Sequence, residues 1–533
     1  MTSMYRACSI LSLPPELLCE VFRQYTSYWD YSLTVDSSNE KYYPILRPMQ
    51  VCSRWRNIAL ALPELFSSLH ISFYSVEYAH NLDVIIQHLS RSGNAPLKLK
   101  IVGPADLDIR FRDDKPSSSS LQQALQLWHL LLDCSERWER VSLTITTQTL
   151  EVAQTHLATR QGDLFPCLTR LSIRALAVGE SHLLAIFRRC PQLSSFFGSI
   201  EHSFSIEAPA LTCINLYYTG NSLAELFCQC PLLQVCTIRG YRKEKDGSGV
   251  THWSSDSPYH HTHLVELNLI SHSSIDRDGF LSVCFPNLKV MALHKSGNLY
   301  QPADLIALML TVSKASLQRL KLSGYQKNDA LAIISTVPSI SHLEIAHISF
   351  IPYTPDSLYG ELIAAKPTLA PSLLSLTITY GTKSRQMRKV QELVSRVVES
   401  RCTISPLGSV LGLQQFTLLL DVFLYYAVFS DGSYPDRDEE SEELEEARRR
   451  EAKHHARLYS GIQERLAPLV DAGLRLDTGV LGYLEGDELE RDSDEAEGEN
   501  EERESGEEDE DDEGESDNSG ESDSVEGDEE EDE

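Results

Sequence analysis

The 533-residue chain is too long for one compact core, and its 42% hydrophobic residues are enough for globular structure over most of its length. Its formal charge of −31 is concentrated at one end, because residues 485–533 hold 30 Asp and Glu against two Arg. That segment accounts for −28 and leaves only −3 for residues 1–484, which argues against a nucleic-acid-binding domain with its usual basic patch.

The first predicted element is an amphipathic helix that opens at two prolines. Pro14 and Pro15 stand where backbone N–H groups would lack helical partners, and Glu16 suits the positive end of a helix. Apolar residues then recur at helical spacing in Leu17, Leu18, Val21, Phe22 and Tyr25. One face of this helix is therefore apolar.

A second apolar stripe follows a polar, aromatic interruption from about Thr26 to Pro44. It predicts another helix with one apolar face, formed by Val51, Cys52, Trp55, Ile58, Ala59 and Leu62. A segment this short cannot bury two such faces unaided. Part of this surface should be covered by a partner or by the following domain.

These stretches resemble an F-box, the helical module by which a substrate receptor docks onto the SKP adaptor of a cullin-RING ubiquitin ligase. The resemblance rests on Leu13-Pro14-Pro15-Glu16-Leu17-Leu18, Val21-Phe22, Val51-Cys52-x-Arg54-Trp55-x-x-Ile58-Ala59 and Pro63-Glu64-Leu65-Phe66. It implies an F-box domain over residues 8–66, and the long interruption resembles insertions common in fungal members of the family. The adaptor-binding residues that it implies are Leu13, Pro14, Leu17, Leu18, Val21, Phe22, Val51, Cys52, Trp55 and Ile58, some of which must build the module's own core.

An internal L-x-x-L-x-L pattern recurs between Leu168 and Leu418, with starts about 27 residues apart on average. Proline introduces many of the units, as in Phe165-Pro166 and Cys230-Pro231, and helical patterns lie between them. This period resembles a degenerate leucine-rich repeat array over residues 67–430, in which parallel strands bury the leucines and helices cover one side. The expected fold class is α/β, a helical F-box followed by an irregular leucine-rich-repeat solenoid; a non-repetitive α/β domain is the alternative.

Other segments of the body carry separate predictions. Strands are expected at residues 68–71 and 141–145, and residues 113–120 are expected to form an exposed loop because they hold charges, a proline and serines. The apolar stretch from Leu407 to Phe429 is interrupted by Gln414, Gln415 and Asp421. It predicts a buried strand or helix rather than a membrane span.

Residues that flank the inward leucines should point out of the opposite side of the sheet, because side chains alternate along a strand. They form the expected binding surface for a target protein, and the candidates are Arg174, Tyr217, Arg239, Asn268, His294 and Lys321. Tyrosine and arginine are favoured interface anchors, since each covers much area and has a directional polar tip. A solvated sheet face without a ligand is the alternative.

Two charged segments end the chain. Residues 431–484 predict a charged helical extension, in which Glu445 with Arg449 and Glu446 with Arg450 have favourable helical spacing. Residues 485–533 hold almost no apolar residues and predict a disordered acidic tail. The tail could act as a solvating segment, contact a basic partner such as a histone, or fold back on the arginines of the sheet.

The sequence predicts no catalytic, metal or cofactor site. His252, His260, His261 and His263 cluster in a polar loop without the spacing of metal ligands. The twelve cysteines form no CxxC pair, and no apolar signal segment is found near residue 1, so we expect an intracellular protein, cytoplasmic, nuclear or both.

The function implied by the F-box resemblance is that of a substrate-recognition subunit of an SCF-type ubiquitin ligase. Its partners would be an SKP-type adaptor, through it a cullin-RING ligase, and an unidentified target protein, with neither nucleic acid nor membrane. The alternative is a non-ligase acidic scaffold or chaperone for basic proteins. A hydrolase that uses the histidine cluster is a third and weaker hypothesis.

Overall fold

The computed structural model describes residues 13–27, 31–35, 43–72, 79–102, 118–158, 160, 164–176, 187, 189–200, 208–218, 223–239, 258–270, 281–295, 303–346, 369–380, 387–404, 410–421, 453 and 456–481. All of them belong to one unit, Met1–Leu481. The acidic tail predicted at 485–533 and the charged pairs predicted at 445–450 lie outside the described residues.

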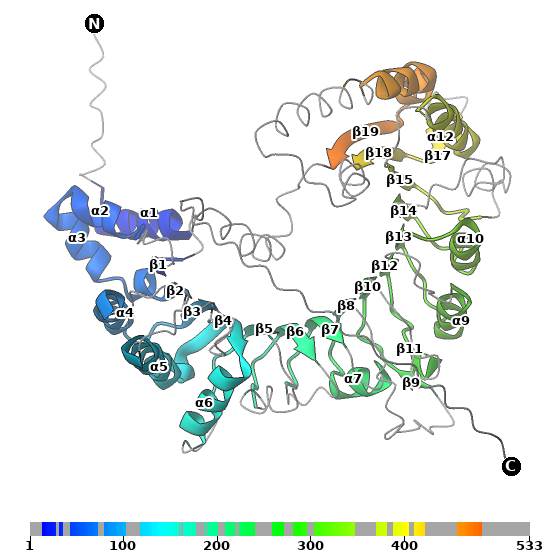
Figure 1. Cartoon of the computed structure of the whole chain (residues 1–533). Helices are drawn as coiled ribbons and strands as arrows, with labels where there is room; N and C mark the ends of the chain where they lie inside the picture. The colour runs from blue at the N-terminus through cyan, green and yellow to red at the C-terminus, as the bar shows by residue number, and fades with distance from the viewer. Residues whose placement is uncertain are drawn as a thin grey trace, which may run out of the picture. The chain divides into compact units, whose positions relative to one another are not determined.

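Fifteen strands form one sheet in which they follow one another in chain order (Figure 1). Every neighbouring pair is parallel. The strands are β1 (Leu33–Val35), β2 (Ser68–Ser72), β3 (Leu97–Val102), β4 (Trp138–Thr146), β5 (Arg170–Leu176), β6 (Ser195–Ile200), β7 (Cys213–Tyr218), β8 (Val235–Arg239), β10 (Glu266–Ile270), β12 (Val290–His294), β13 (Arg319–Ser323), β14 (His342–Ala346), β15 (Ser375–Tyr380), β18 (Gln415–Asp421) and β19 (Arg475–Leu481).

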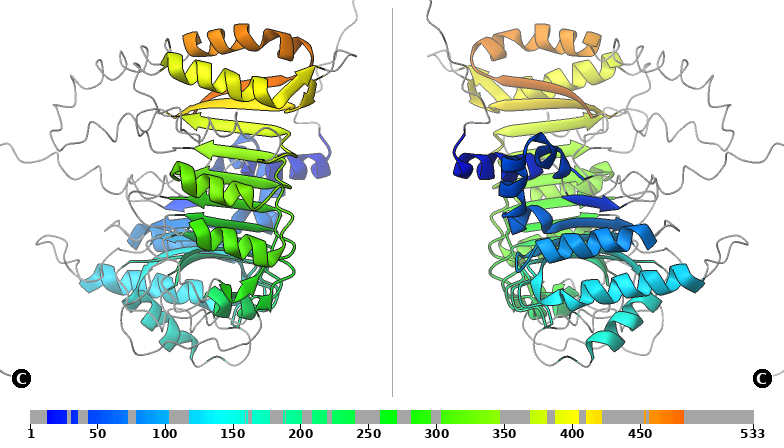
Figure 2. Two further views of the ribbon diagram at one scale, coloured as in Figure 1. Left: turned by 90° about the vertical axis from the view of Figure 1, so that its right-hand side faces the viewer. Right: turned by 90° about the vertical axis from the view of Figure 1, so that its left-hand side faces the viewer.

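Helices connect many of the strands and lie on one side of the sheet (Figures 1 and 2). They are α4 (Ala79–Arg91), α5 (Ser118–Asp133), α6 (Thr147–Leu157), α7 (Leu223–Gln229), α9 (Ala303–Ser313), α10 (Lys327–Ser335), α12 (Met387–Arg401) and a helix at 456–471. Two small sheets pair β9 (Tyr259–His260) with β11 (Val283–Cys284) and β16 (Cys402–Ile404) with β17 (Val410–Gly412). The predicted α/β class is confirmed.

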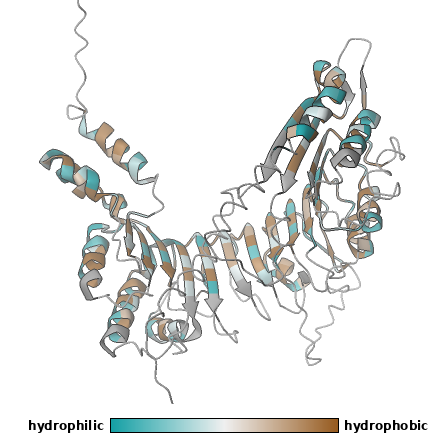
Figure 3. Cartoon of the chain, turned by 45° about the horizontal axis from the view of Figure 1, so that its top comes forward, coloured by the Kyte–Doolittle hydropathy of each residue, from teal (hydrophilic) through white to brown (hydrophobic). Residues whose placement is uncertain are grey.

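The repeated leucines form the core between the sheet and the helices. In β10, Leu267 and Leu269 are buried, whereas Glu266, Asn268 and Ile270 are partly exposed, so buried and partly exposed positions alternate. Hydrophobic and hydrophilic residues are interspersed along the strands of the sheet (Figure 3). In-register pairing stacks the buried residues of neighbouring strands into continuous columns. Each strand is thus covered by its neighbours, as in solenoid-like repeats.

A recurring turn explains the proline that precedes many of the strands. The amide of the first leucine-type residue donates to the carbonyl three residues earlier, and proline holds the second position of the turn. This happens in 165–168, 190–193, 208–211, 230–233, 285–288, 337–340 and 370–373. Proline fits there because its fixed φ suits that position and its missing N–H is not needed. Before β10 the turn has no proline, and the ring of His261 accepts the amide of Leu264 instead (3.2 Å).

The N-terminal segment contains helices, but they differ from the prediction. It forms α1 (Pro15–Ser27), α2 (Leu46–Val51), α3 (Ser53–Leu60) and the 3-10 turn η2 (Pro63–Phe66). The single second helix expected from the apolar stripe was wrong, because Val51 ends α2 and Cys52 is the extended N-cap of α3. The interruption contributes β1 to the sheet, which the sequence did not predict.

Two further predictions need correction. The exposed loop expected at 113–120 overlaps α5, which begins at Ser118, and residues 113–117 lie outside the described part. The extension at 431–484 holds the helix at 456–471, but it also supplies β19, which pairs with β18. By contrast, the strands expected at 68–71 and 141–145 are confirmed as β2 and β4, and the Leu407–Phe429 stretch holds β18. Within the described ranges, no helix has the length and apolar character that crossing a membrane requires.

Candidate protein-binding surfaces

The N-terminal helices have a small core of their own. Leu18 and Phe22 of α1 are buried against Trp55 of α3, and the Phe22 and Trp55 rings meet edge to face with centroids 5.3 Å apart. This arrangement suits the aromatic quadrupoles. The remaining buried members of the cluster are Ile45, Met49, Ala59, Leu65 and Phe66.

The same helices also carry apolar side chains that this core does not cover. Leu17 is 52% exposed and Val21 is 39% exposed, and they lie one turn apart on the same face of α1. Val51, at the end of α2, is 52% exposed, and Leu46 and Leu60 are exposed as well. Five of the twelve exposed large hydrophobic residues in the described part of the chain therefore lie between residues 17 and 60. We call Leu17, Val21 and Val51 the apolar helix surface.

The ten residues implied by the F-box resemblance thus divide into three groups. Leu18, Phe22 and Trp55 are core residues and are not available to a partner. The side chains that are half-buried at the edge of the core are Leu13, Cys52 and Ile58. The side chains exposed to a partner are Pro14, Leu17, Val21 and Val51.

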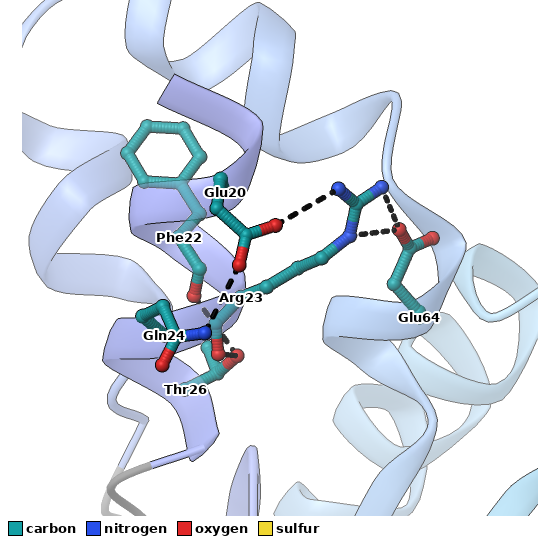
Figure 4. A network of polar contacts seen from close by, with 6 residues as sticks. All are labelled: Glu20, Phe22, Arg23, Gln24, Thr26 and Glu64. Carbon is teal, nitrogen blue, oxygen red and sulfur yellow. Dashed lines mark hydrogen bonds and ion pairs between the residues drawn. The ribbon is translucent and has the colours of Figure 1, made fainter. Parts of the chain in front are cut away.

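Side-chain hydrogen bonds and ion pairs connect α1 with η2 and α3, and Figure 4 shows those between α1 and η2. Arg23 of α1 donates through Nε (3.0 Å) and Nη2 (2.7 Å) to Glu64 Oε1 in η2, and Glu20 lies 3.7 Å from the same guanidinium. Burial opposes ionisation of Glu64, but hydrogen bonds from the backbone and from Arg23 outweigh it and lower its pKa. Arg54 of α3 donates to the carbonyl of Leu13 (2.6 Å), which places the junction of α2 and α3 beside the start of α1.

A buried histidine joins this helical module to the sheet. His88 of α4 lies 5.1 Å from the ring of Phe66, and its Nε2 lies 3.2 Å from the hydroxyl of Ser32, next to β1. Ser32 donates its own proton to the carbonyl of Ser68, so it accepts from Nε2–H of a neutral imidazole. Burial, assisted by the charge of Arg91, lowers the pKa of His88 to about 4.

We expect acid to weaken this junction. The unfolded chain protonates His88 near its ordinary pKa of 6.5, whereas the folded chain resists protonation down to about 4, so stability is complete above the first value and falls toward the second. Between pH 7.5 and pH 5 this histidine should cost about 2 kcal/mol of folding free energy. Urea unfolding of His88→Gln should show an acid-induced loss smaller by that amount. An equal acid-induced loss of stability in the unmodified chain and in His88→Gln would show that His88 is not the group responsible.

The second candidate surface is the polar face of the sheet, the side opposite the buried leucines. In-register pairing places Tyr217, Arg239, Ile270 and His294 at successive positions of one row that crosses β7 to β12. Asn268, Ala292 and Lys321 occupy the adjacent row. The predicted target-binding residues therefore share one face, and three of them share one row. Arg174 lies on the same face of β5, at the ladder position opposite Thr144.

The side chains on this face differ in how available they are to a partner protein. Arg239 donates to Asn215 (3.2 Å) and lies over the ring of Phe197 (6.0 Å), which holds its guanidinium in place. Tyr217, beside it, is 45% exposed. Asn268 bonds to Thr237 and Glu266, and Lys321 forms an ion pair with Glu344 (2.9 Å). Tyr217 therefore offers exposed area for partner binding. The polar groups of Arg239, Asn268 and Lys321 already have partners in the chain, and those of Arg239 hold its guanidinium in place.

The structure groups Arg174, one of the predicted target-binding residues, with further cations. Lys98 and Lys100 of β3 and Arg140 of β4, which the sequence did not single out, join Arg170 and Arg174 of β5 on the polar face. We call these five residues the basic cluster. The sequence signal was the alternation in Leu97-Lys98-Leu99-Lys100-Ile101, which reads as a strand with one charged face.

The histidine cluster does not converge on a site. His261 is buried, packs against Phe227 and Phe285, and its Nε2 bonds to the carbonyl of Cys230 (2.9 Å), whereas His260 and His263 are exposed. His252 lies outside the described residues. No group of three or more metal-ligating side chains is found among the residues that the structure describes.

Some other titratable groups of the described residues lie buried in the core or line a hollow. Burial raises the pKa of the Cys230 thiol to about 12 and raises that of Cys236 further, so both are poor nucleophiles. A hollow of about 490 Å³ between α5 and α6 is lined by His129, Glu151, Val152, Thr155 and His156. There the two imidazoles stack 4.6 Å apart, and His156 bonds to Asp133 (3.0 Å), which fixes its ring.

No family model and no curated protein matches the chain. Among solved structures, the crystal structure of a protein from Bacteroides fragilis is similar over 59% of this chain and 82% of its own length, with 10% sequence identity and a TM-score of 0.28. Likeness at this level supports no statement about function. The function is therefore argued from the two surfaces.

Proposed function

We propose that the protein is a substrate-recognition subunit of an SCF-type ubiquitin ligase. In this proposal residues 8–66 are an F-box that docks on an SKP-type adaptor. Residues 67–430 are a degenerate leucine-rich repeat array, which β19 extends and whose polar face binds a target protein. The chain would contribute to ubiquitin transfer by proximity, since holding the target near the conjugating enzyme makes the encounter effectively intramolecular.

The observation that carries the proposal is the apolar helix surface. An isolated α-helical module would turn its large apolar side chains inward, yet Leu17, Val21 and Val51 remain exposed while Leu18 and Phe22 beside them fill the core. Exposed apolar side chains gathered on one small module mark a protein-binding site. They also fall within the sequence that resembles an F-box.

The proposal is tested by introducing two carboxylates on the apolar helix surface, where a bound adaptor would bury them. We expect Leu17→Asp with Val21→Asp to weaken binding of a purified SKP-type adaptor by about a hundredfold or more, since both carboxylates would be desolvated in the interface. Isothermal titration calorimetry on the full chain measures the effect. Leu18 must not be used in this test, because it is fully buried and its replacement would unfold the module.

A matched control is available on the outer side of the sheet. Leu308 and Val312 are 42% and 44% exposed and also lie one turn apart, on α9. Leu308→Asp with Val312→Asp should leave adaptor affinity unchanged. Failure of the unmodified chain to bind adaptor, or an equal loss in both double variants, would reject the ligase proposal.

A second candidate function is favoured by the charge of residues 485–533, which hold 30 acidic residues and two arginines. In this alternative the protein is an acidic scaffold or chaperone for basic proteins, and attraction to that segment supplies the affinity. Deleting residues 485–533 separates the two functions. The scaffold loses its basic partners on deletion, whereas the ligase subunit still binds adaptor.

A further inference from the structure

The polar face of the sheet has an uneven distribution of charge. In the row nearest the start of the strands, Lys98 faces Arg140 and Arg140 faces Arg170 on three successive strands. Neighbouring strands lie about 4.8 Å apart, so three cations stand at nearly the closest spacing that a sheet allows. Lys100 and Arg174 extend the group along β3 and β5 on the same face.

In the described part of the chain, carboxylates neutralise few of the cations Lys98, Arg140, Arg170 and Arg174. The carboxylate of Glu139 lies beside Arg140, with Oε1 3.6 Å from Nε. Within the described residues, no carboxylate forms an ion pair with Lys98, Arg170 or Arg174. Like charges directly opposite each other in a sheet are destabilising. Lys98, Arg140 and Arg170 are exposed, so a ligand can reach them.

The contrast with the rest of the same face is clear. Further along the sheet, some cations have a neighbouring carboxylate, as in the pairs Lys321 with Glu344 and Arg475 with Asp477. Among the described strands, one row holds cations on three successive strands only at β3, β4 and β5.

We propose that the basic cluster binds an acidic peptide segment of the target protein, whose carboxylates pair with Lys98, Arg140 and Arg170. This deepens the proposed function, on which it rests, by naming the chemistry of the target. An extended peptide places side chains of one face about 6.6 Å apart, close enough to the strand spacing for alternate carboxylates to meet successive cations. Arginine favours this role because its fork can bind a carboxylate through two parallel hydrogen bonds.

Tyr217 and Arg239 provide a neighbouring anchor for the same peptide. They lie on β7 and β8, which follow β5 and β6 in the sheet, so the strand order puts them within about 15 Å of β5. The ring of Tyr217 offers apolar contact area, and the guanidinium of Arg239, held by Asn215 and Phe197, offers hydrogen bonds in a fixed direction. The site would therefore select a segment in which acidic residues are followed or preceded by an apolar or aromatic one.

A nucleic acid is the other polyanion that such cations could attract. The cluster covers only three strands, about 10 Å across, whereas nucleic-acid-binding domains carry an extended basic surface. The formal charge of −31 repels an acidic peptide and a nucleic acid alike at long range, so it does not distinguish the two ligands. Binding of an acidic probe would therefore depend on local contacts rather than on net charge.

The test uses the full chain and a fluorescein-labelled oligoglutamate peptide, followed by fluorescence anisotropy. Arg140→Glu with Arg170→Glu should raise the dissociation constant by about tenfold or more, because two attractions become repulsions. Arg396→Glu with Arg457→Glu makes the same charge change at two exposed helical positions and should leave it within about twofold. Raising salt from about 50 to about 500 mM should weaken binding to the unmodified chain.

Four results would overturn the proposal. They are equal binding of an oligoglutamine peptide of the same length, equal losses in the two double variants, tighter binding of an oligothymidine of similar length, and binding seen only after truncation behind Leu484. The last result would assign the cluster to the chain's own acidic residues. Adaptor binding should be unchanged in Arg140→Glu with Arg170→Glu, so failure of the ligase proposal and failure of this one are distinguishable.

Discussion

Replacing Phe22 by alanine is expected to destabilise the N-terminal helical module by about 3–5 kcal/mol. The ring is 1% exposed and meets Trp55 edge to face, so its removal takes away apolar burial and leaves a cavity beside the indole. Hydrogen exchange followed by mass spectrometry is the suitable measurement, because it reports on α1 and α3 separately from the sheet. Protection of amides in these helices should fall by about a hundredfold or more.

Leu17→Ala is the matched control for Phe22→Ala. Leu17 lies on the same helix but is 52% exposed, so its truncation should change stability by less than about 0.5 kcal/mol. The pair of variants therefore separates residues that build the module from residues that are left for a partner. If Leu17→Ala exposed the helices as strongly as Phe22→Ala, Leu17 would be covered and the apolar helix surface would not exist.

The repeats were the part of the fold that could be predicted from the sequence. Each strand of the fifteen-stranded sheet from β5 to β18 buries two residues of an L-x-x-L-x-L unit, and seven of the preceding turns place proline at the position where its geometry fits. Both signals are local, because the pattern of one strand and one turn is complete within about ten residues. Such signals can be recognised in the sequence without knowing which strands are neighbours.

Strands that are buried through contacts with residues distant in the sequence were not predicted. β1 has three residues, pairs with β2 and buries Leu33 and Val35 in the main core, and β19 follows a charged helix without a leucine repeat before it. The helix α5 did carry an apolar pattern, in Leu127, Trp128, Leu131 and Leu132, but the serines in its first turn favoured a loop. In these cases long-range packing decides the structure.

The candidate sites show the same limit. Leu17 and Leu18 are adjacent and chemically identical, yet one is half exposed and the other fully buried, and only the orientation of α1 against α3 decides which is which. The basic cluster depends on the register of three strands that are far apart in sequence. Sequence could name the candidate residue types, but not the face or row on which each residue lies.

Gly324→Ala is expected to destabilise the sheet by about 3 kcal/mol or more. Gly324 follows β13 with φ of +75°, and its amide donates to the carbonyl of Ala346 (3.1 Å). A Cβ at this position would lie 2.1 Å from the carbonyl oxygen of Lys295, whose own amide donates to Ser323 (2.8 Å). Backbone must therefore move in two turns that cross-link β12, β13 and β14, and urea unfolding followed by circular dichroism should report the loss.

Gly93→Ala distinguishes this close contact from strain in the glycine conformation itself. Gly93 also has positive φ, at +52°, but the nearest atom to its Cβ would be that of Pro63 at 3.9 Å. Only the left-handed conformation is then penalised, at about 1 kcal/mol. The excess cost at Gly324 measures how closely the turns of neighbouring strands approach. Equal destabilisation by Gly324→Ala and Gly93→Ala would mean that the turns of neighbouring strands can move apart at little cost. The turns would then not fix the register of the strands, on which the rows of the polar face depend.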